Sequence, residues 1–506
     1  MLPTPVSEGT GVGNFRFKTT NLISKITFFL KPMITTLIIL FFIGYLGIAL
    51  EHPLKVDKTA TALLLGMLLW IIYALGAEYI VPLVEADHFK AYLESHPMLA
   101  NESLHKQALS YVTDVKLVES LGDITQTLFF LIGAMTIVEL VDIHGGFTVI
   151  TNKITTRNKR TLLWVLCCVT FIFSAVLDNM TTTIVMVLLL RKLVAEQEER
   201  WLYTGMIVIA ANTGGAWSPI GDVTTIMLWV KGNVTALALI EYVLLPSLVA
   251  MVVPLLLIQG RLKGTLTPVE GTQQDQTHGM SARERLTIFC LGVGGLLFVP
   301  IFKSITHLPP FVGMLFVLGV LWLYTEIFYN GKKTERRKQH RLPQVISRID
   351  MPSILFFLGI LLAVGVLEAS GILAAAAAWL DSEVHNVYII NILLGIMSSI
   401  FDNVPLVAGV MGMYPIEHAD VVGYAANFVQ DGVFWEFLSY CAGVGGSMLI
   451  IGSAAGVIAM GLDKINFGWY LKRFSLIALL GYLAGAGVYI LEVLLMKAPF
   501  LGIPNL

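Results

Sequence analysis

Two short motifs in apolar surroundings carry the residues whose types and spacing point to chemistry. The first runs through Phe173–Thr183, FSAVLDNMTTT, and the second through Met397–Pro405, MSSIFDNVP. Aligned on Asp178 and Asp402, both read S-x-(V/I)-x-D-N, with an offset of 402 − 178 = 224 in a chain of 506 residues. A carboxylate at membrane depth costs free energy and usually has a function. The repetition predicts an internally duplicated protein with one such carboxylate in each half.

The chemistry that these motifs allow is cation binding in competition with protons. Alkali cations prefer oxygen ligands, which carboxylates, side-chain amides and hydroxyls supply. Burial in a membrane disfavours a charged carboxylate, whereas a bound cation favours it. Na+ and H+ would therefore compete for Asp178 and Asp402, and a site that faced each side in turn would exchange them. The neutral ligands expected around these carboxylates are Ser174, Asn179, Thr181, Thr182, Thr183, Asn212, Ser398, Asn403 and Ser447.

The overall composition places the motifs in an integral membrane protein. The residues are 56% hydrophobic and 13% charged, with a mean hydropathy of +0.77, whereas soluble domains carry about 25% charged residues. A net charge of −2 gives no reason to expect nucleic acid as a partner. Neither a phosphate-binding loop nor a hydrolase nucleophile elbow occurs. The four cysteines lie in apolar segments without a pairing pattern, so we expect neither a disulfide nor a cofactor.

Both motifs lie in apolar runs that we predict to be re-entrant hairpins. The run 161–190 has cations at both ends, in Lys153–Arg160 and at Arg191, so both ends belong on the cytoplasmic side. Each half is about 22 Å of helix, which passes the midplane of a bilayer core of about 30 Å without crossing it. The second run, 386–413, follows a basic loop at 332–348 and one further span, and is therefore expected to open from the outside.

A helix interrupted by glycine follows each hairpin. Residues 204–228 contain NTGGAWSPIGD, and residues 434–461 contain GVGGS followed by a second Gly-Ser pair. Proline and close-set glycines free backbone groups that a membrane tolerates only inside protein or around a polar cavity. We therefore predict two discontinuous helices, although the glycines could instead serve close helix packing. The predicted break residues are Gly214, Gly215, Pro219, Gly445, Gly446 and Ser447.

Two further polar residues, Asp222 and Thr224, follow the first break. Ser453 takes the place of Asp222 in the second half, at an offset of 453 − 222 = 231. Since the two halves differ here, at most one extra carboxylate joins the site. Asp222 is then either a coupling residue or a cap on the outer half-helix.

The remaining apolar runs complete two repeats of the same order. We predict an amino-terminal segment 1–32, a first repeat 33–258, a cytoplasmic linker 259–284 and a second repeat 285–498. The acidic stretch 81–120 reads as an external loop. Because the hairpins open from opposite faces, the expected fold is an all-α polytopic membrane protein with two inverted-topology repeats, which is typical of secondary transporters with a site at the midplane. Single spans are expected at about 33–50, 59–80, 123–147, 236–258, 286–302, 311–329, 351–379 and 474–495.

The motifs also resemble those of a known family. The runs DNMTTT, NTGGAWSPIGDVTT, SSIFDNVP and GVGGSMLIIGSAAG resemble the NhaD-type sodium/proton antiporters of the ion transporter superfamily, over about residues 121–470. The resemblance implies exchange of Na+ or Li+ for H+, a scaffold with a mobile transport domain, a homodimer, and a location in a bacterial inner membrane. By motif position it implies functional roles for Asp178, Asn179, Asn212, Asp222, Thr224, Ser398, Asp402 and Asn403.

Three other functions remain to be weighed. A sodium-coupled symporter of organic anions is the main alternative within the superfamily, but the aspartate at each tip would repel an anion and no Arg or Lys lies within either motif. An intramembrane aspartyl protease would want Tyr-Asp and Gly-x-Gly-Asp motifs, and SPIGD does not supply the second. A channel would not need paired occluding hairpins. A cation exchanger, rather than an enzyme, is the prediction.

Overall fold

The structure is a computed structural model that describes residues 31–48, 51, 55–147, 154, 156–266, 281–330, 345–400 and 402–496. The regular structure in these residues is helical, apart from two isolated β-bridges. The chain divides into two compact units: one comprises residues up to Gly122 with Leu358–Ala376, and the other comprises Asp123–Phe357 with the residues from Ala377 onward. Nearly all of the predicted amino-terminal segment, most of the predicted linker and the basic loop up to residue 344 lie outside the described residues.

Nine helices in the described part of the chain are long and apolar enough to cross a membrane. Each has at least 18 residues, close to the roughly 20 that a bilayer core requires. They confirm an all-α polytopic membrane protein, whereas the inverted orientation of the halves and the re-entry of the hairpins stay predictions. The nine are Lys31–Ile48, Lys58–Leu75, Leu104–Ile143, Lys159–Leu177, Ala236–Arg261, Arg283–Thr306, Pro310–Ile327, Met351–Ala369 and Phe467–Met496.

The acidic stretch 81–120, predicted as a loop, is mostly helical. Besides its charged residues, this stretch contains aromatic side chains that pack on one another. The ring of Tyr111 contacts those of Phe89 and Tyr92 edge to face, at centroid distances of 5.5 and 5.4 Å. Such pairs stabilise short helices that composition alone would assign to a loop. The elements are α4 (Ala77–Val84), α5 (Ala86–Ser95), η1 (Pro97–Asn101), α6 (Leu104–Tyr111) and η2 (Val112–Lys116), which leads into α7 (Leu117–Ile143).

The first unit also pairs two apolar helices that lie far apart in the sequence. The helix α3 (Lys58–Leu75) meets α18 (Met351–Ala369) where Trp70 Nε1 donates to the carbonyl of Leu362 at 3.0 Å. The span predicted at 351–379 is two helices, because the chain turns at Gly371, whose φ of 74° favours glycine, before α19 (Ile372–Glu383) begins.

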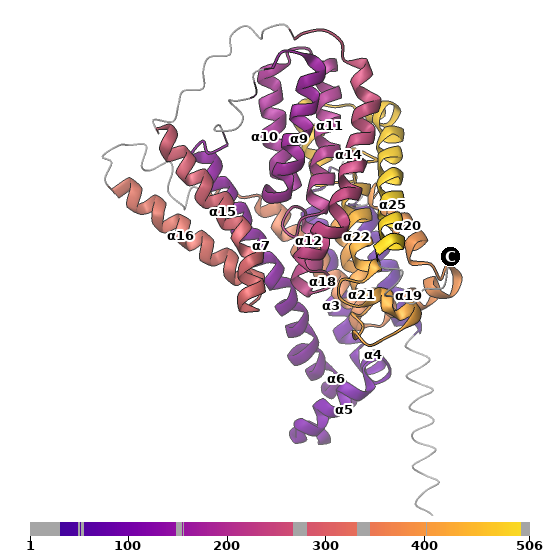
Figure 1. Cartoon of the computed structure of the whole chain (residues 1–506). Helices are drawn as coiled ribbons and strands as arrows, with labels where there is room; N and C mark the ends of the chain where they lie inside the picture. Colours follow the sequence, from indigo (N-terminus) through magenta and orange to yellow (C-terminus); the bar gives the residue numbers. More distant parts are fainter. Residues whose placement is uncertain are drawn as a thin grey trace, which may run out of the picture. The chain divides into compact units, whose positions relative to one another are not determined.

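The second unit contains both hairpins and both interrupted helices (Figure 1). Each hairpin packs its first arm on the following interrupted helix of its own half, and its second arm contacts a half-helix from the other half of the chain. Equivalent asparagines, Asn158 and Asn386, cap the first arms by accepting from two backbone N–H groups each. The elements are α9 (Lys159–Leu177), α10 (Asn179–Leu193), α11 (Gln197–Ala216) and α12 (Val223–Lys231), then α20 (Val387–Ser398), α21 (Asn403–Met413), α22 (Val433–Gly445) and α23 (Ala454–Asp463).

The other helices surround this group or connect it. They are α13 (Ala236–Ala238), η3 (Leu239–Val243), α14 (Leu244–Ile258), η4 (Gln259–Arg261), α15 (Ala282–Thr306), α16 (Pro310–Asn330), η6 (Gly423–Phe428), α24 (Phe467–Tyr470), η7 (Leu471–Ser475) and α25 (Leu476–Met496). The helices α14 and α25 pack against each other, as do α15 and α16.

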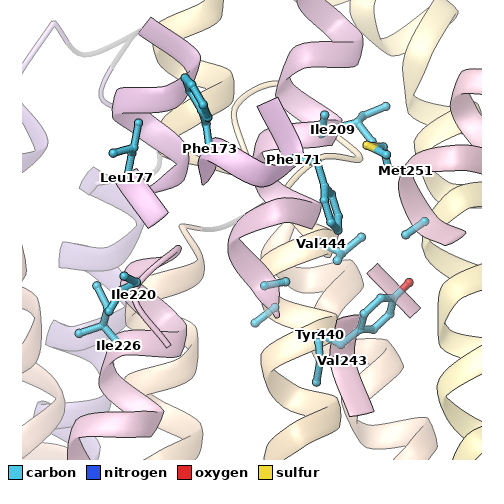
Figure 2. Close-up of a cluster of buried hydrophobic side chains, with 14 of the residues drawn as sticks. Phe171, Phe173, Leu177, Ile209, Ile220, Ile226, Val243, Met251, Tyr440 and Val444 are labelled. Carbon is cyan, nitrogen blue, oxygen red and sulfur yellow. The ribbon is translucent and has the colours of Figure 1, made fainter. Parts of the chain in front are cut away.

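Apolar side chains fill the space between the interrupted helices and their neighbours. Figure 2 shows Phe171 of α9, Ile209 of α11, Met251 of α14 and Val444 of α22 in one cluster, and all four are buried. Because such a core is close-packed, a shift of one helix by an ångström is felt by its neighbours. The cluster therefore holds the polar residues at the helix interruptions in fixed positions.

Candidate functional site

The first hairpin turns at a single residue, Asp178, which separates α9 from α10. Its backbone has φ 77° and ψ 157°, a conformation that costs a residue other than glycine about 1–3 kcal/mol. The side chain caps α10 by accepting from the N–H and the hydroxyl of Thr181, at 2.8 and 2.9 Å. A strained backbone that aims a carboxylate into a helix start is found where geometry serves a function.

The second hairpin presents its aspartate differently. Asp402 caps α21 by accepting from the N–H of Val404 at 3.2 Å, with an ordinary φ of −55°. Both tip carboxylates are partly buried. The twin motifs thus share a capping role but not a backbone conformation.

The carboxylate on which the two halves converge is that of Asp222, which is 1% exposed. It caps α12 through the N–H and hydroxyl of Thr224, at 2.9 and 2.8 Å. The amide of Asn179 donates to it at 2.5 Å, and the amide of Asn403 approaches it at 3.4 Å. Asp222 is therefore a cap, as one reading of the sequence predicted, and also the meeting point of both hairpin tips.

A third asparagine extends this network to the other interrupted helix. Asn212 of α11 accepts from Asn179 at 3.2 Å and donates to the hydroxyls of Ser447 and Ser453, at 3.0 and 2.8 Å. Ser453 in turn caps α23 by accepting from the N–H of Gly456. Ser453 is not among the predicted ligands, although its position, equivalent to that of Asp222, indicates a place at the site.

Three predicted ligands, Ser174, Thr182 and Ser398, stand apart from these hydrogen bonds. The hydroxyl of Ser398 donates to the carbonyl of Ala442 at 2.8 Å, as that of Ser174 does to Ala211 at 2.5 Å, so both serines join a hairpin to its interrupted helix. The buried hydroxyl of Thr182 has no hydrogen-bond partner among the described residues. Leaving such a group unpaired costs about 1–3 kcal/mol, so an oxygen ligand is available one turn after Asp178.

The predicted break residues divide into two groups. Pro219 and Ser447 lie in the non-helical residues, whereas Gly214 and Gly215 lie in the last turn of α11. A Cβ on Gly214 would lie 2.8 Å from the Cα of Phe171, so this glycine lets α11 approach α9. In the second half Gly445 ends α22 and Gly446 caps it, and a Cβ on Gly445 would lie 2.8 Å from the carbonyl carbon of Gly395. Close helix packing, the alternative reading, accounts for Gly214 and Gly445.

Like charges lie near one another at the site. Asp222 is close enough to both Asp178 and Asp402 for direct repulsion between their charges. The buried polar residues in the described part of the chain include no lysine or arginine. A carboxylate cluster without a neighbouring fixed cation is stabilised by protons or by a bound cation.

Side-chain oxygens gathered at the interruptions of buried helices, inside a bundle of membrane spans, define the secondary-transporter class of membrane proteins. A family model described as "Citrate transporter" matches residues 45–427. Sodium/proton antiporter 1 of Arabidopsis thaliana is 44% identical over 89% of this chain and 71% of its own length, and sodium/proton antiporter 2 of the same plant is 41% identical over 89% and 98%. The Na(+)/H(+) antiporter NhaD of Vibrio cholerae is 28% identical over 90% of this chain and 91% of its own length. The chain belongs to the family of NhaD-type sodium/proton antiporters, within the superfamily that the citrate-transporter model describes.

Proposed function

We propose that this chain exchanges Na+ or Li+ for H+ by alternating access. The observation that carries the proposal is the convergence of Asn179 and Asn403, from the two halves of the chain, on the buried carboxylate of Asp222. This arrangement gathers carboxylate, amide and hydroxyl oxygens, which suit an alkali cation. The names of the relatives, sodium/proton antiporters of a plant and of bacteria, favour Na+ and H+ as the exchanged ions.

The proposed roles follow from the charge of each group. Asp178 and Asp402, with Asp222 between them, alternate between protonated and cation-bound states. Asn179, Thr182, Asn212, Thr224, Ser398 and Asn403 supply or orient neutral oxygens. Because the negative charge of Asp222 repels those of Asp178 and Asp402, binding of one cation and release of protons are linked. No cofactor beyond the transported ions is required.

A second candidate is a sodium-coupled symporter of organic anions, which the description of the matching family model favours. An anion site needs helix N-termini or cations left open for a carboxylate. Here the N-termini of α10, α12 and α21 are occupied by Asp178, Asp222 and Asp402. An organic anion would meet three negative charges, so cation exchange is the better proposal.

The proposed architecture is an inverted repeat. Equivalent contacts in the two halves support it: Ser174 to Ala211 and Ser398 to Ala442 join hairpin and interrupted helix in the same way. Asp222 and Ser453 cap equivalent half-helices. The homodimer remains a prediction from the resemblance. So does the bacterial inner membrane, because the similar proteins come from a plant as well as from bacteria.

Purified protein in liposomes containing a pH-sensitive dye tests the function directly. An imposed Na+ gradient is expected to change the internal pH without any organic substrate, and Li+ should substitute for Na+. Citrate added with Na+ should leave the rate unchanged. A pH change that required citrate, or uptake of radiolabelled citrate, would support the symporter instead.

A further inference from the structure

A buried carboxylate outside the site lies at the far end of the half-helix α23. Asp463, whose side chain is fully buried, accepts from Nε of Arg200 at 2.6 Å and from the hydroxyl of Thr204 at 2.6 Å. Arg191 approaches the same carboxylate at 3.4 Å. The backbone carbonyl of Asp463 also accepts from the indole of Trp201 at 2.9 Å. We call this group the Asp463 cluster.

Three helices run from the candidate site to the Asp463 cluster. The helix α10 begins beside Asp178 and carries Arg191 in its last turn. The helix α23 begins after Ser453 and ends at Asp463 itself. The helix α11 carries Arg200, Thr204 and Asn212, so it passes the cluster near its start and reaches the site near its end.

The helices α11 and α23 are joined at both ends over similar lengths. At the site, Asn212 donates to Ser453 at 2.8 Å. At the cluster, Thr204 donates to Asp463 at 2.6 Å. The attachment points are 212 − 204 = 8 residues apart on α11 and 463 − 453 = 10 residues apart on α23, or about 12 and 15 Å at 1.5 Å per residue. Two attachments at such spacing fix the position of one helix along the other.

The attachment of Thr204 to Asp463 therefore affects the geometry at the candidate site. A slip of α23 by one residue is about 1.5 Å along its axis. That shift would lengthen the 2.8 Å hydrogen bond from Asn212 to Ser453 and turn it away from its preferred angle, which weakens it. Asn212 is also the acceptor for Asn179, which donates to Asp222, so the displacement would reach the central carboxylate.

We propose that Asp463 is a positioning residue for cation binding: by holding the end of α23 against α11, it sets the place of Ser453 and, through Asn212, of the oxygen ligands. This inference rests on the proposed exchange function and adds a residue that touches neither ion. It follows that loss of the Asp463 contacts lowers cation affinity more than it slows turnover.

A nearby ion pair provides a matched comparison. Lys159 of α9 pairs with Glu199 of α11 at 2.8 Å, and Glu199 directly precedes Arg200. It joins α9 to α11, which are also held by the bond from Tyr203 to the carbonyl of Lys159 at 3.0 Å and by that from Ser174 to Ala211. Removing Glu199 leaves these attachments and the position of α23 intact.

The experiment measures the initial rate of Na+-driven pH change in liposomes against Na+ concentration, for the wild type and four variants. Asp463→Asn is expected to raise the apparent KM for Na+ about tenfold, as loss of a supporting ligand contact does at metal sites. Thr204→Val, which removes one hydrogen bond and leaves no charge unpaired, should raise it about threefold. Thr204→Ser keeps the hydroxyl and should retain the wild-type KM, as should Glu199→Gln. In all four variants kcat is expected to stay within about twofold, since binding and not turnover is altered.

The outcomes separate the two claims. A wild type without Na+-driven pH change overturns the exchange function and, with it, the role of Asp463. An active wild type with unchanged KM in Asp463→Asn and Thr204→Val overturns the positioning role alone, as does a fall in kcat at constant KM. If Asp463→Asn is not recovered as folded protein, the pair Thr204→Val and Thr204→Ser decides by the same criterion.

Discussion

The amide nitrogen of Asn179 lies 2.5 Å from a carboxylate oxygen of Asp222, which joins the tip of the first hairpin to the start of α12. From the second half of the chain, Asn403 approaches the same carboxylate at 3.4 Å. The tip residues Asp178 and Asp402 instead cap the hairpin helices that follow them. Asp222 thus contacts both hairpins. A change in its charge alters its contact with Asn179 of the first and with Asn403 of the second.

The first prediction concerns the charge of Asp222. Asp222→Asn should lower Na+-driven exchange in liposomes at least about tenfold, because the variant loses a titrating ligand. Its stability should stay within about 1 kcal/mol of the wild type, since asparagine caps a helix as well as aspartate does. Thermal unfolding in detergent, measured beside exchange, separates the two effects. Exchange near the wild-type rate would remove Asp222 from the ion site.

The second prediction compares the two tip aspartates. Asp178→Asn and Asp402→Asn should each fold and severely impair exchange, because asparagine keeps the cap but not the charge. Glycine should separate the positions: at 178 it relieves the strain of about 1–3 kcal/mol that Asp178 bears at a φ of 77°, which offsets the lost cap. At 402, where φ is −55°, there is no such strain to relieve, and glycine should only destabilise. Equal changes in unfolding temperature for the two glycine variants would contradict this account.

The sequence predicted those features that a short segment of the chain shows by itself. The charge of Asp178 and Asp402 in apolar runs, and the glycines before each interruption, are visible in single segments of about 15 residues. The position of Asp222 between the hairpin tips was not predictable. It depends on the packing of α12 against α21, and these two helices come from opposite halves of the chain. The helices at 81–120 were missed for a related reason: the packing of Tyr111 on Phe89 and Tyr92 outweighs the polar composition.

The third prediction concerns the close approach of the interrupted helices to the hairpins. Gly214→Ala and Gly445→Ala place a methyl group against backbone atoms of α9 and α20, which cannot rotate away. Each should lower the free energy of unfolding by about 1–3 kcal/mol. Gly409→Ala in α21, where the added group meets nothing within 4 Å, is the control and should be neutral or stabilising. Similar losses in all three variants would argue against a packing role for Gly214 and Gly445.

The fourth prediction is a pH dependence in the helical stretch after α3. Burial raises the pKa of Glu85, but hydrogen bonds from Lys116 at 2.9 Å and His88 at 3.1 Å outweigh it and leave this pKa below its ordinary value of 4.5. The contribution to stability is therefore full above about pH 4.5 and is lost as the pH falls through the lowered pKa. Glu85→Gln should cost about 1 kcal/mol at pH 7 and nothing at the acid limit. A cost independent of pH would indicate that packing, not charge, is lost.

The last prediction tests the orientation of the two hairpins. The connector between α10 and α11 and that between α21 and α22 hold equivalent positions. Glu198 is an exposed acidic residue in the first turn of α11, directly after the first connector, and Asp420 is one within the second. Arg191 and Arg200 flank the first connector, which favours the cytoplasmic side. Single cysteines at 198 and 420, in a chain whose four native cysteines are replaced, should react with a membrane-impermeant maleimide from opposite faces of sealed vesicles. Detergent should make both reactive, which controls for accessibility. Reaction of both from the same face would mean that the hairpins enter the membrane together, and the inverted repeat would have to be abandoned while the contacts at Asp222 stand.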